Sequence, residues 1–201
     1  FTHYLQGPSA AQILADLGAD VVKVEPIKGA YERGWSGCNT YKNGVSVFYL
    51  MANRNQRDLA IDLKSEEGRE TIYTLIRDKG YDVIIENFRP GVMDKLGLGY
   101  EKLKEINPRV VYCSCTGYGS AGPKAKKPGQ DLLLQGMSGL AALTGPSDHP
   151  PMPAGTALVD QHGAILAALG IVSAVYDRDR TGIGHKVDAS LLGSALDLQI
   201  E

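Results

Sequence analysis

Short apolar runs alternate along this sequence with longer amphipathic segments, and this alternation restricts the fold more than any other feature. The runs at 20–25, 82–87 and 109–119 are typical of buried strands, whereas the segments at 8–19 and 65–80 carry helix signals. A chain that returns to its sheet through a helix places neighbouring strands parallel. We therefore predict an α/β fold with a Rossmann-like, mainly parallel sheet, helices on both faces and ligands beyond the carboxyl ends of the strands.

The most apolar segment is GAILAALGIVSAVY at residues 163–176, which predicts a largely buried helix of about four turns. A Gly-rich hairpin and an amphipathic helix are expected to follow it. No apolar run is expected to reach membrane-spanning length. The other predicted elements are a loop at 26–44, a strand at 57–63, a loop at 119–130, a helix at 131–145 and short helices at 46–55, 90–97 and 100–107.

Size and composition favour one ordinary globular domain, with 201 residues, 43% hydrophobic and 22% charged side chains. The formal net charge of −2 argues against a nucleic-acid or anionic-membrane partner. The three cysteines, which include Cys113 and Cys115 on one predicted strand, fit neither a disulfide framework nor a zinc site. We therefore expect a reducing, cytoplasmic setting.

Both ends of the sequence suggest a fragment of a longer chain. The first residue is Phe1 rather than Met, and residues 1–10 have the pattern of a strand end that continues into a helix. Residues 189–201 have an amphipathic helical pattern without a stop signal. We expect chain to be missing at both ends, so that any targeting signal lies outside the sequence.

Asp160 is the residue around which we predict the site, and it has two interpretations. It directly precedes the predicted buried helix, where Asp commonly caps the free N–H groups of the first turn. Alternatively, it is a carboxylate nucleophile that is ionised near neutral pH and needs no base to activate it. The two roles are compatible, because the same N–H groups could stabilise an oxyanion at a neighbouring carbonyl. The residues alone leave both interpretations open.

A second candidate cluster is the sequence ENFRPG at 86–91, which ends a predicted strand. Its amide, aromatic ring and guanidinium could bind a nucleotide-like ligand, with nearby lysines meeting the phosphates. Polar residues are also common at strand ends, so a solvated surface is the alternative. Both interpretations stay open for Asn87 and Arg89, whereas the lysines of the 119–130 loop are expected to be solvated.

Several other motifs give weaker signals. GYGSAG at 117–122 matches G-x-G-x-x-G after a strand, but Pro123 and Pro128 prolong a loop where a dinucleotide site needs a helix start. A Ser-His-Asp hydrolase is not supported, because the sequence holds no G-x-S-x-G elbow. His162 lies two residues after Asp160, and residues at i and i+2 of a helix face apart, so we expect no dyad between them.

An ordered set of motifs extends over nearly the whole chain: FTH with QGP, LADLGADVVKVE, NQRDLAIDLK, DVIIENFRPGVMDKLGLGYEKLKEINPRVVY, GYG, ALVD and TGIGHKVDASLL. This set resembles the class III CoA-transferases, a superfamily that includes formyl-CoA, carnitine-CoA and bile-acid CoA-transferases and the α-methylacyl-CoA racemases. The resemblance implies that residues 1–201 form the N-terminal portion of a large, CoA-binding Rossmann-like domain. It also implies a second, smaller domain beyond residue 201 and a homodimer of two interlocked chains.

The resemblance places the catalytic aspartate of the family at Asp160. The implied reaction moves CoA from an acyl-CoA donor to a carboxylic acid acceptor, through an aspartyl mixed anhydride and an aspartyl-CoA thioester. Such intermediates survive only where water is excluded. The implied partners are thus acyl-CoA thioesters, as substrates, and a free acid, with no permanently bound cofactor and no metal.

The resemblance also implies a set of CoA contacts in loops and at strand ends. Two departures affect the expected adenine site: residues 29–33 read GAYER in place of the Gly-Asp-x-x-Arg of the family, and Pro26 stands where some members carry a base-stacking Arg. The implied contacts fall on His3, Leu5, Gln6, Leu63, Lys64, Asn87, Phe88, Arg89, Lys95, Gly129, Gln130 and Asp131.

One position separates the two activities of the superfamily. Racemases carry a general-base His where this chain has Gln130, and an amide cannot abstract an α-proton. The sequence therefore favours a transferase. An acyl-CoA racemase is the alternative, and a dinucleotide-binding oxidoreductase is a third and less favoured class.

Overall fold

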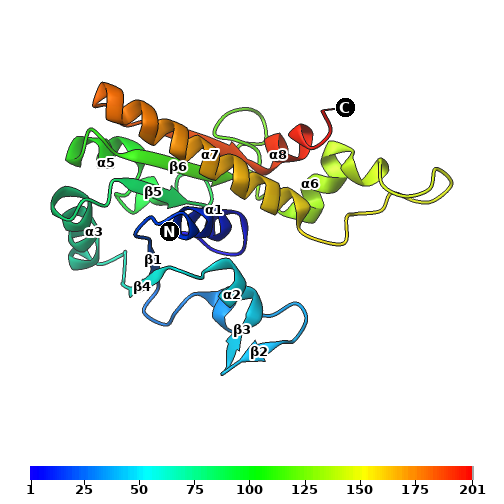
Figure 1. Ribbon diagram of the computed structural model, residues 1–201, viewed down its shortest axis with the longest axis horizontal. Helices are drawn as coiled ribbons and strands as arrows, with labels where there is room; N and C mark the ends of the chain where they lie inside the picture. The colour runs from blue at the N-terminus through cyan, green and yellow to red at the C-terminus, as the bar shows by residue number, and fades with distance from the viewer. Residues whose placement is uncertain (201) are drawn as a thin grey trace.

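The computed structural model of the chain describes residues 1–200 and alternates helices with strands (Figure 1). The strands are β1 (Val22–Glu25), β2 (Tyr41–Lys42), β3 (Val45–Ser46), β4 (Arg57–Ala60), β5 (Val83–Glu86), β6 (Val111–Thr116) and β7 (Lys186–Ser190). The helices are α1 (Gln6–Asp16), α2 (Val47–Ala52), α3 (Glu66–Asp78), α4 (Val92–Lys95), α5 (Tyr100–Ile106), α6 (Asp131–Ser138), α7 (Leu158–Thr181) and α8 (Leu191–Asp197), with 3₁₀ turns at Tyr31–Arg33 and Leu140–Ala142.

The strands form two parallel sheets. β1 pairs with β4, and β5, β6 and β7 pair in that order. Within residues 1–200, the one antiparallel pair is the small hairpin of β2 and β3. The predicted α/β fold with parallel strands is therefore confirmed, but the described strands form two separate sheets rather than a single one.

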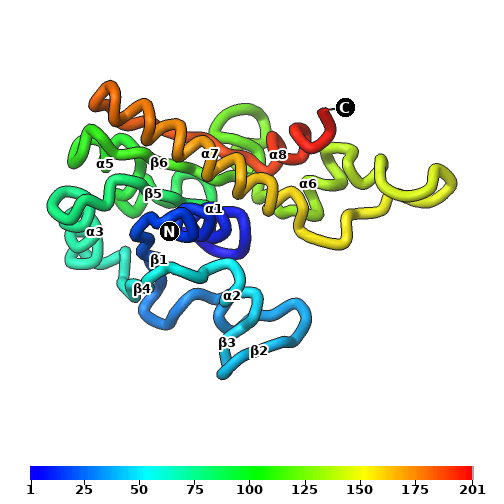
Figure 2. The backbone as a smooth tube through the Cα atoms, viewed as in Figure 1, coloured from blue at the N-terminus to red at the C-terminus, as the bar shows by residue number. Residues whose placement is uncertain are grey.

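Helices cover both faces of the β5–β6–β7 sheet, as predicted (Figures 1 and 2). On one face, Val111 and Cys113 of β6 pack against Ala164 and neighbouring small residues of α7, and α1 joins the same cluster. On the other face, Tyr112 packs in a cluster with Ile76 of α3 and side chains of α5. Burial of one such aliphatic side chain contributes about 1.5–3 kcal/mol, so these two clusters hold the sheet and its helices together.

α7 is the longest helix, with 24 residues, and extends beyond the predicted 163–176 at both ends. Its length and a mean hydropathy of 1.6 over its most apolar window would allow it to cross a membrane, which corrects the expectation that no segment is long enough. In this fold α7 packs against α1, β6 and β7 (Figure 1). The helix ends before Gly182, whose φ of 79° is a left-handed conformation that favours glycine.

The helix predicted at 65–80 is confirmed as α3, including its capping signal. The hydroxyl of Ser65 accepts a hydrogen bond from the Gly68 N–H at 3.0 Å. Glu66 and Glu67 lie in the first turn, where the helix dipole favours negative charge.

Three local predictions are wrong. The segment expected as a hairpin after α7 contains the strand β7, whose conformation is decided by pairing with β6. The sequence did not predict this strand because KVDAS at 186–190 is short and only half apolar. The helix predicted at 131–145 ends at Ser138, since Gly139 adopts a φ of 94°. The predicted 26–44 loop contains a 3₁₀ turn and β2, elements too short to produce a periodic pattern.

Candidate active site

A cavity of about 630 Å³ lies where β5 and β6 end, as expected for a parallel α/β fold. The first residues of three helices line it, namely Gln6 of α1, Asp131 of α6 and, within the first turn of α7, Asp160. Free N–H groups at helix starts carry partial positive charge, and Arg89 and Lys127 add full charges to the lining. The cavity therefore suits an anionic ligand.

Most of the residues assigned by the resemblance line this cavity, but three do not. Leu63 packs in the hydrophobic cluster around α3, and Lys64 and Lys95 are exposed elsewhere on the surface. Their assignment to a CoA site stays a prediction. The assigned residues that line the cavity are His3, Leu5, Gln6, Asn87, Phe88, Arg89, Gly129, Gln130, Asp131 and Asp160.

Asp160 lies inside the first turn of α7 rather than at its cap. The N-cap position belongs to Ala157, which makes no side-chain hydrogen bond, so the capping interpretation of Asp160 is wrong. Instead, the backbone N–H of Asp160 donates to Oδ2 of Asp131 at 2.8 Å. The carboxyl group of Asp160 is thereby left free to face the cavity.

The protonation of Asp160 differs from the expectation based on an ordinary pKa. Burial, together with the nearby charge of Asp131, raises the pKa of Asp160 from 3.8 to about 7. The group is therefore half protonated at neutral pH in the described chain, rather than fully ionised. A carboxylate with a pKa near the working pH is also a stronger nucleophile than an ordinary one, because nucleophilicity rises with basicity.

Asp131 belongs to a hydrogen-bond network that fixes the entry to α7. Its Oδ1 accepts a hydrogen bond from Nε2 of Gln135 at 2.5 Å, so both carboxylate oxygens are occupied by protein donors. Gln135 also donates to the carbonyl of Thr156 at 3.3 Å and accepts from the N–H of Ala154 at 2.8 Å. The first turn of α6 thus holds the segment that leads into Asp160.

The side chain of Gln6 lies against the first turns of α7. A Cβ added at Gly163 would meet its Nε2 at 2.6 Å, so the absence of a side chain at Gly163 makes room for the amide. Within residues 1–200, Gln6 Nε2 is the one buried side-chain nitrogen or oxygen without a hydrogen-bond partner. A buried donor without a partner is costly, and this nitrogen lies against α7 while the residue Gln6 as a whole lines the cavity.

Asn87 uses its amide to hold the start of the chain. Its Oδ1 accepts from the N–H of His3 at 2.8 Å, and its Nδ2 donates to the carbonyl of His3 at 2.7 Å. The ring of His3 lies 5.3 Å from that of Phe88. The next residue, Tyr4, has a φ of 58°, a strained value for a bulky side chain, and its N–H donates to the buried carboxylate of Glu32 at 2.7 Å.

Two glycines allow the loop after β6 to close the cavity. A Cβ at Gly117 would lie 2.5 Å from the Cα of Gly129, and a Cβ at Gly129 would lie 2.3 Å from the Cα of Gly117. The two backbones therefore touch, which only glycine permits. This packing accounts for the first glycine of the motif at 117–122, whereas Gly119 and Gly122 adopt positive φ values of 90° and 96°.

The structure adds aromatic residues that the sequence interpretation missed. Trp35 and Phe48 line the cavity and form an edge-to-face pair with ring centroids 5.3 Å apart. They come from a loop and from α2, so no local pattern joins them. Of the polar and sulfur side chains of β6, Cys115 and Thr116 line the cavity, whereas Cys113 packs under α7 and Ser114 bonds Glu86.

The histidines of the described residues lie in three different settings. Nε2 of His162 lies 2.7 Å from a carboxylate oxygen of Asp197, away from Asp160, so no Asp160–His162 dyad forms. His185 pairs in the same way with Asp177 at 2.6 Å on the surface. His3 is the histidine that lines the cavity.

Parallel strands packed under helices, with the carboxyl groups of Asp131 and Asp160 in a cavity lined by helix N-termini, define an α/β fold with an acidic cavity at the carboxyl ends of its strands. The chain belongs to CoA-transferase family III, whose family model matches residues 1–201. This membership also confirms the family resemblance found in the sequence.

Related proteins agree in sequence and in structure. The acetyl-CoA:oxalate CoA-transferase of Acetobacter aceti is 41% identical over 196 residues, which cover 97% of this chain and 49% of that protein. The succinyl-CoA:glutarate CoA-transferase of Mus musculus is 39% identical, over 96% of this chain and 44% of that protein. The crystal structure of a CAIB/BAIF family protein from Brucella suis superposes with a TM-score of 0.94 at 39% identity, covering 100% of this chain and 53% of the other. The chain therefore spans about half the length of the relatives that it matches.

Proposed function

We propose that the full-length protein is a class III CoA-transferase that moves CoA from an acyl-CoA donor to a carboxylic acid. The observation that carries the proposal is the half-buried carboxyl group of Asp160 in a cavity surrounded by helix N-termini. Relatives named for exchange of CoA with oxalate and with glutarate support the same class of reaction. The donor and acceptor acids of this protein are left open.

The proposed reaction uses Asp160 as a covalent nucleophile. Its carboxylate attacks the thioester carbonyl, the C–S bond breaks, and CoA leaves as the thiolate with a mixed anhydride on Asp160. The thiolate then attacks the aspartyl carbonyl, which releases the donor acid and gives an aspartyl-CoA thioester. The acceptor carboxylate attacks this thioester to form a second anhydride and free thiolate. Attack of the thiolate on the acceptor carbonyl gives the new acyl-CoA and regenerates the carboxylate of Asp160.

Gln6 serves this reaction as a hydrogen-bond donor. Each step passes through a tetrahedral centre that carries negative charge on an oxygen. The unpartnered Nε2 of Gln6 lies beside the first turns of α7, and a rotation of the side chain toward the cavity, which Gln6 lines, would let it donate to such an oxygen. Loss of one such donor typically costs about 10²–10³ in kcat.

The cavity residues His3, Leu5, Arg89, Gly129 and Gln130 are proposed to contact the CoA part of the substrate. Asn87 contributes by holding the backbone of His3, since its amide already bonds that residue. Leu63, Lys64 and Lys95 lie outside the cavity and would contact CoA only where it extends over the surface.

Transfer is favoured over racemisation because Gln130, in the cavity wall, has no titrating group to remove an α-proton. The imidazole that lines the cavity is that of His3, and burial lowers its pKa more than the nearby carboxylate of Glu32 raises it. A racemase would exchange the α-proton of a 2-methylacyl-CoA for solvent deuterium without any acceptor acid. A dinucleotide oxidoreductase would bind NAD(H) and not CoA.

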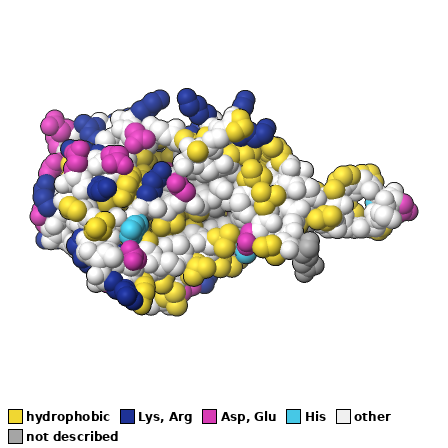
Figure 3. Space-filling model, turned by 90° about the horizontal axis from the view of Figure 1, so that it is seen from above, with side chains coloured by type: hydrophobic (Ala, Val, Ile, Leu, Met, Phe, Trp, Pro, Cys, Tyr) yellow, Lys and Arg dark blue, Asp and Glu magenta, His cyan; other side chains and the backbone are white. Residues whose placement is uncertain are grey.

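A homodimer is proposed from exposed apolar side chains. Ile165, Leu169, Val172 and Tyr176 form a stripe along α7 and are 48–64% exposed. The segment between α6 and α7 projects from the body as an arm that bears hydrophobic side chains (Figure 3). Surfaces of this kind mark association sites, and light scattering of the full-length protein should give twice the chain mass. The free thiols of Cys38, Cys113 and Cys115 are consistent with a cytoplasmic location.

The test of the function is mass spectrometry of the full-length protein after incubation with a panel of acyl-CoAs and then hydroxylamine. A modification on the peptide that contains Asp160 is expected with productive donors. Asp160→Asn should lose CoA exchange by at least about 10³-fold, whereas Asp197→Asn, which removes an exposed carboxylate bound to His162, should keep it. An unmodified Asp160 peptide with every donor, while CoA still binds, would refute the covalent mechanism.

A further inference from the structure

Tyr4 is a strained residue in the wall of the cavity, between His3 and Leu5, two of the assigned CoA contacts. Its φ of 58° is a left-handed conformation, which a residue with a bulky side chain adopts only where the surrounding structure imposes it. The side chain of Tyr4 is 51% exposed, so close packing of the ring does not impose this conformation. The cause therefore lies in the hydrogen bonds of the backbone around Tyr4.

The peptide between His3 and Tyr4 is held at both ends. Its carbonyl, on His3, accepts from Nδ2 of Asn87 at 2.7 Å, and its N–H, on Tyr4, donates to Oε1 of Glu32 at 2.7 Å. Oδ1 of Asn87 also accepts from the N–H of His3 at 2.8 Å. We call this arrangement the peptide clamp, with Asn87 at one end and Glu32 at the other.

The clamp explains why the strain at Tyr4 persists. A flip of the peptide by about 180° would bring φ of Tyr4 from 58° to about −120°, an ordinary extended value. The same flip would turn the N–H away from Glu32 and point the carbonyl oxygen of His3 toward its carboxylate. It would also remove the acceptor of Asn87 Nδ2. Hydrogen bonds at both ends of the peptide, one of them to a carboxylate, thus outweigh the strain.

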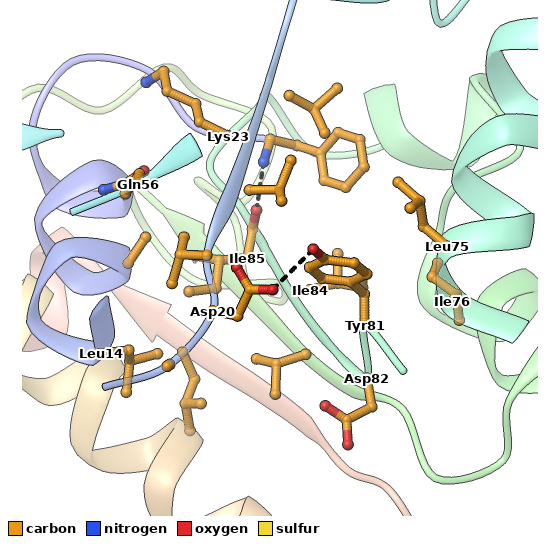
Figure 4. Close-up of a pocket in the computed structure, with 18 of the residues that line it drawn as sticks. Leu14, Asp20, Lys23, Gln56, Leu75, Ile76, Tyr81, Asp82, Ile84 and Ile85 are labelled. Carbon is orange, nitrogen blue, oxygen red and sulfur yellow. Dashed lines mark hydrogen bonds between the residues drawn. The ribbon is translucent and has the colours of Figure 1, made fainter. Parts of the chain in front are cut away.

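Lys23 fixes the chain just before the clamp. Its side chain leaves β1 on the side of the loop that precedes α1 (Figure 4), and its Nζ donates to the carbonyl of Thr2 at 3.2 Å and to Oδ1 of Asn53 at 2.7 Å. Lys23 is buried, and Glu25 and Glu32 supply the nearby negative charge that a buried ammonium group needs. Glu32 therefore acts both on the clamp and on the lysine that holds the preceding residue.

The turn that carries Glu32 is anchored firmly enough to serve as one end of the clamp. Glu32 is 3% exposed and lies in the 3₁₀ turn before β2. Nε of the next residue, Arg33, lies 2.7 Å from Oε2 of the buried Glu25, and its Nη2 lies 2.7 Å from Oδ2 of Asp58. The same oxygen of Glu25 accepts from the N–H of Ala30 at 2.9 Å. These bonds tie both sides of the turn to β1 and β4.

We propose that Glu32 is a positioning residue of the cavity, which holds the His3–Tyr4 peptide in its strained orientation and so keeps His3 and Asn87 in place for CoA. This role rests on the proposed function, because it takes CoA as the ligand of the cavity. Glu32 acts through the backbone of Tyr4 and not by contact with the ligand. Its loss leaves the Tyr4 N–H without an acceptor, lets the peptide flip and frees both Asn87 and His3, so that the wall no longer fits the ligand.

Calorimetric titration of the full-length protein with CoA measures the role of Glu32 without turnover. Glu32→Ala should raise the Kd for CoA at least about tenfold, because the Tyr4 N–H loses its acceptor and the peptide flips. Glu32→Gln should stay within about threefold of the wild type, since its amide oxygen can still accept from the Tyr4 N–H. The matched control is Asp58→Ala, which removes an exposed carboxylate from the Arg33 ion pairs but not from the clamp, and which should also stay within about threefold.

A second background tests whether the conformation of Tyr4 transmits the effect. Glycine adopts a positive φ without strain, so a Tyr4→Gly chain no longer needs the clamp to hold this conformation. In that background, Glu32→Ala should raise the Kd by less than about threefold. Kinetics give an independent check, because Glu32→Ala should raise KM for the acyl-CoA by the same factor as the Kd and keep kcat within about threefold. A general loss of folded protein would instead lower kcat at an unchanged Kd.

The role of Glu32 would be overturned by any of three results for the Kd. These are a value for Glu32→Ala within about threefold of the wild type, an equal rise in Glu32→Gln or Asp58→Ala, and an undiminished rise in the Tyr4→Gly background. If Glu32→Ala does not fold, amide exchange of the wild-type protein decides. The Tyr4 N–H should exchange at least about a hundredfold more slowly than an unprotected amide, and faster exchange would overturn the clamp. A wild-type protein that binds no CoA would contradict the proposed function as well, whereas normal wild-type binding with an unchanged Kd in Glu32→Ala contradicts the clamp alone.

Discussion

Replacement of Asp131 by Asn tests how the pKa of the proposed nucleophile is set. The change removes a negative charge next to Asp160 but keeps an oxygen that can accept from the Asp160 N–H, which now donates to Oδ2 of Asp131 at 2.8 Å. The Asn amide nitrogen then faces Nε2 of Gln135, the present donor to Oδ1. This donor–donor contact should lower the free energy of unfolding by about 1–3 kcal/mol.

The expected size of the pKa effect follows from the causes of the raised value. The pKa of Asp160 is about 7 against an ordinary 3.8, and burial is the larger cause, with the charge of Asp131 second. Asp131 therefore accounts for less than half of the difference, or up to about 1.5 pH units, equivalent to about 2 kcal/mol. A fall of about 1 pH unit would raise the ionised fraction of Asp160 at pH 6 from about 10% to about 50%.

The assay is the pH profile of kcat/KM for CoA exchange by the full-length enzyme, because its acid limb reports the pKa of the essential base in the free enzyme. In Asp131→Asn this limb should move down by about 1 pH unit, so that activity at pH 6, relative to the plateau, rises about fivefold. Asp197→Asn removes another carboxylate near the start of α7 and should leave the limb in place. An unchanged limb in Asp131→Asn would refute the electrostatic argument, whatever happens to the plateau.

Three further substitutions probe single contacts. Gly163→Ala should raise the helix propensity of α7 by about 1 kcal/mol. It should nevertheless lower kcat at least about tenfold, because the added Cβ would lie 2.6 Å from Nε2 of Gln6. The control is Gly136→Ala in α6, where the added Cβ meets no atom within 4 Å and kcat should be unchanged. Ser65→Ala should lower the free energy of unfolding in urea by about 1 kcal/mol through loss of the α3 cap, and no loss would contradict the capping geometry. Asp160→Asn should raise the free energy of unfolding by up to about 4 kcal/mol at pH 8 and leave it unchanged at pH 4. An equal rise in the free energy of unfolding at both pH values would contradict the raised pKa of Asp160.

Much of the fold could be predicted because its elements carry local signals. The helix at 65–80 has a serine cap and charged first turn, and the strand at 82–87 is a continuous apolar run, so each was found. β7 was missed because a half-apolar run of five residues has no strand signal until it pairs with β6. Sequence periodicity also says nothing about which strands are neighbours, so the pairing of β1 with β4 and the order β5, β6, β7 emerged only from the structure.

The site could be predicted only as far as its motifs reach. The motifs single out Asp160 as a candidate, but its raised pKa depends on burial by elements distant in sequence and on Asp131, 29 positions earlier. The interpretation of Asp160 as a cap failed because α7 begins before it, where Ala157 has no capping side chain. The pairing of Trp35 with Phe48 is likewise a tertiary contact without a local pattern.

The placement of Asp160 shows how this fold balances stability against reactivity. The folded state raises the pKa of Asp160 above its value in the unfolded chain, so it holds a proton more tightly, and stability falls as pH rises from about 4 to about 7. Partial exposure lets water screen the charge, so the full loss of about 4 kcal/mol is an upper figure. The fold accepts this loss at the turn where Gln6 keeps an unpartnered donor. In the proposed mechanism, attack on a thioester carbonyl moves the negative charge of the Asp160 carboxylate onto the carbonyl oxygen, so the cost of keeping that carboxylate desolvated is relieved in the transition state and not in the substrate complex.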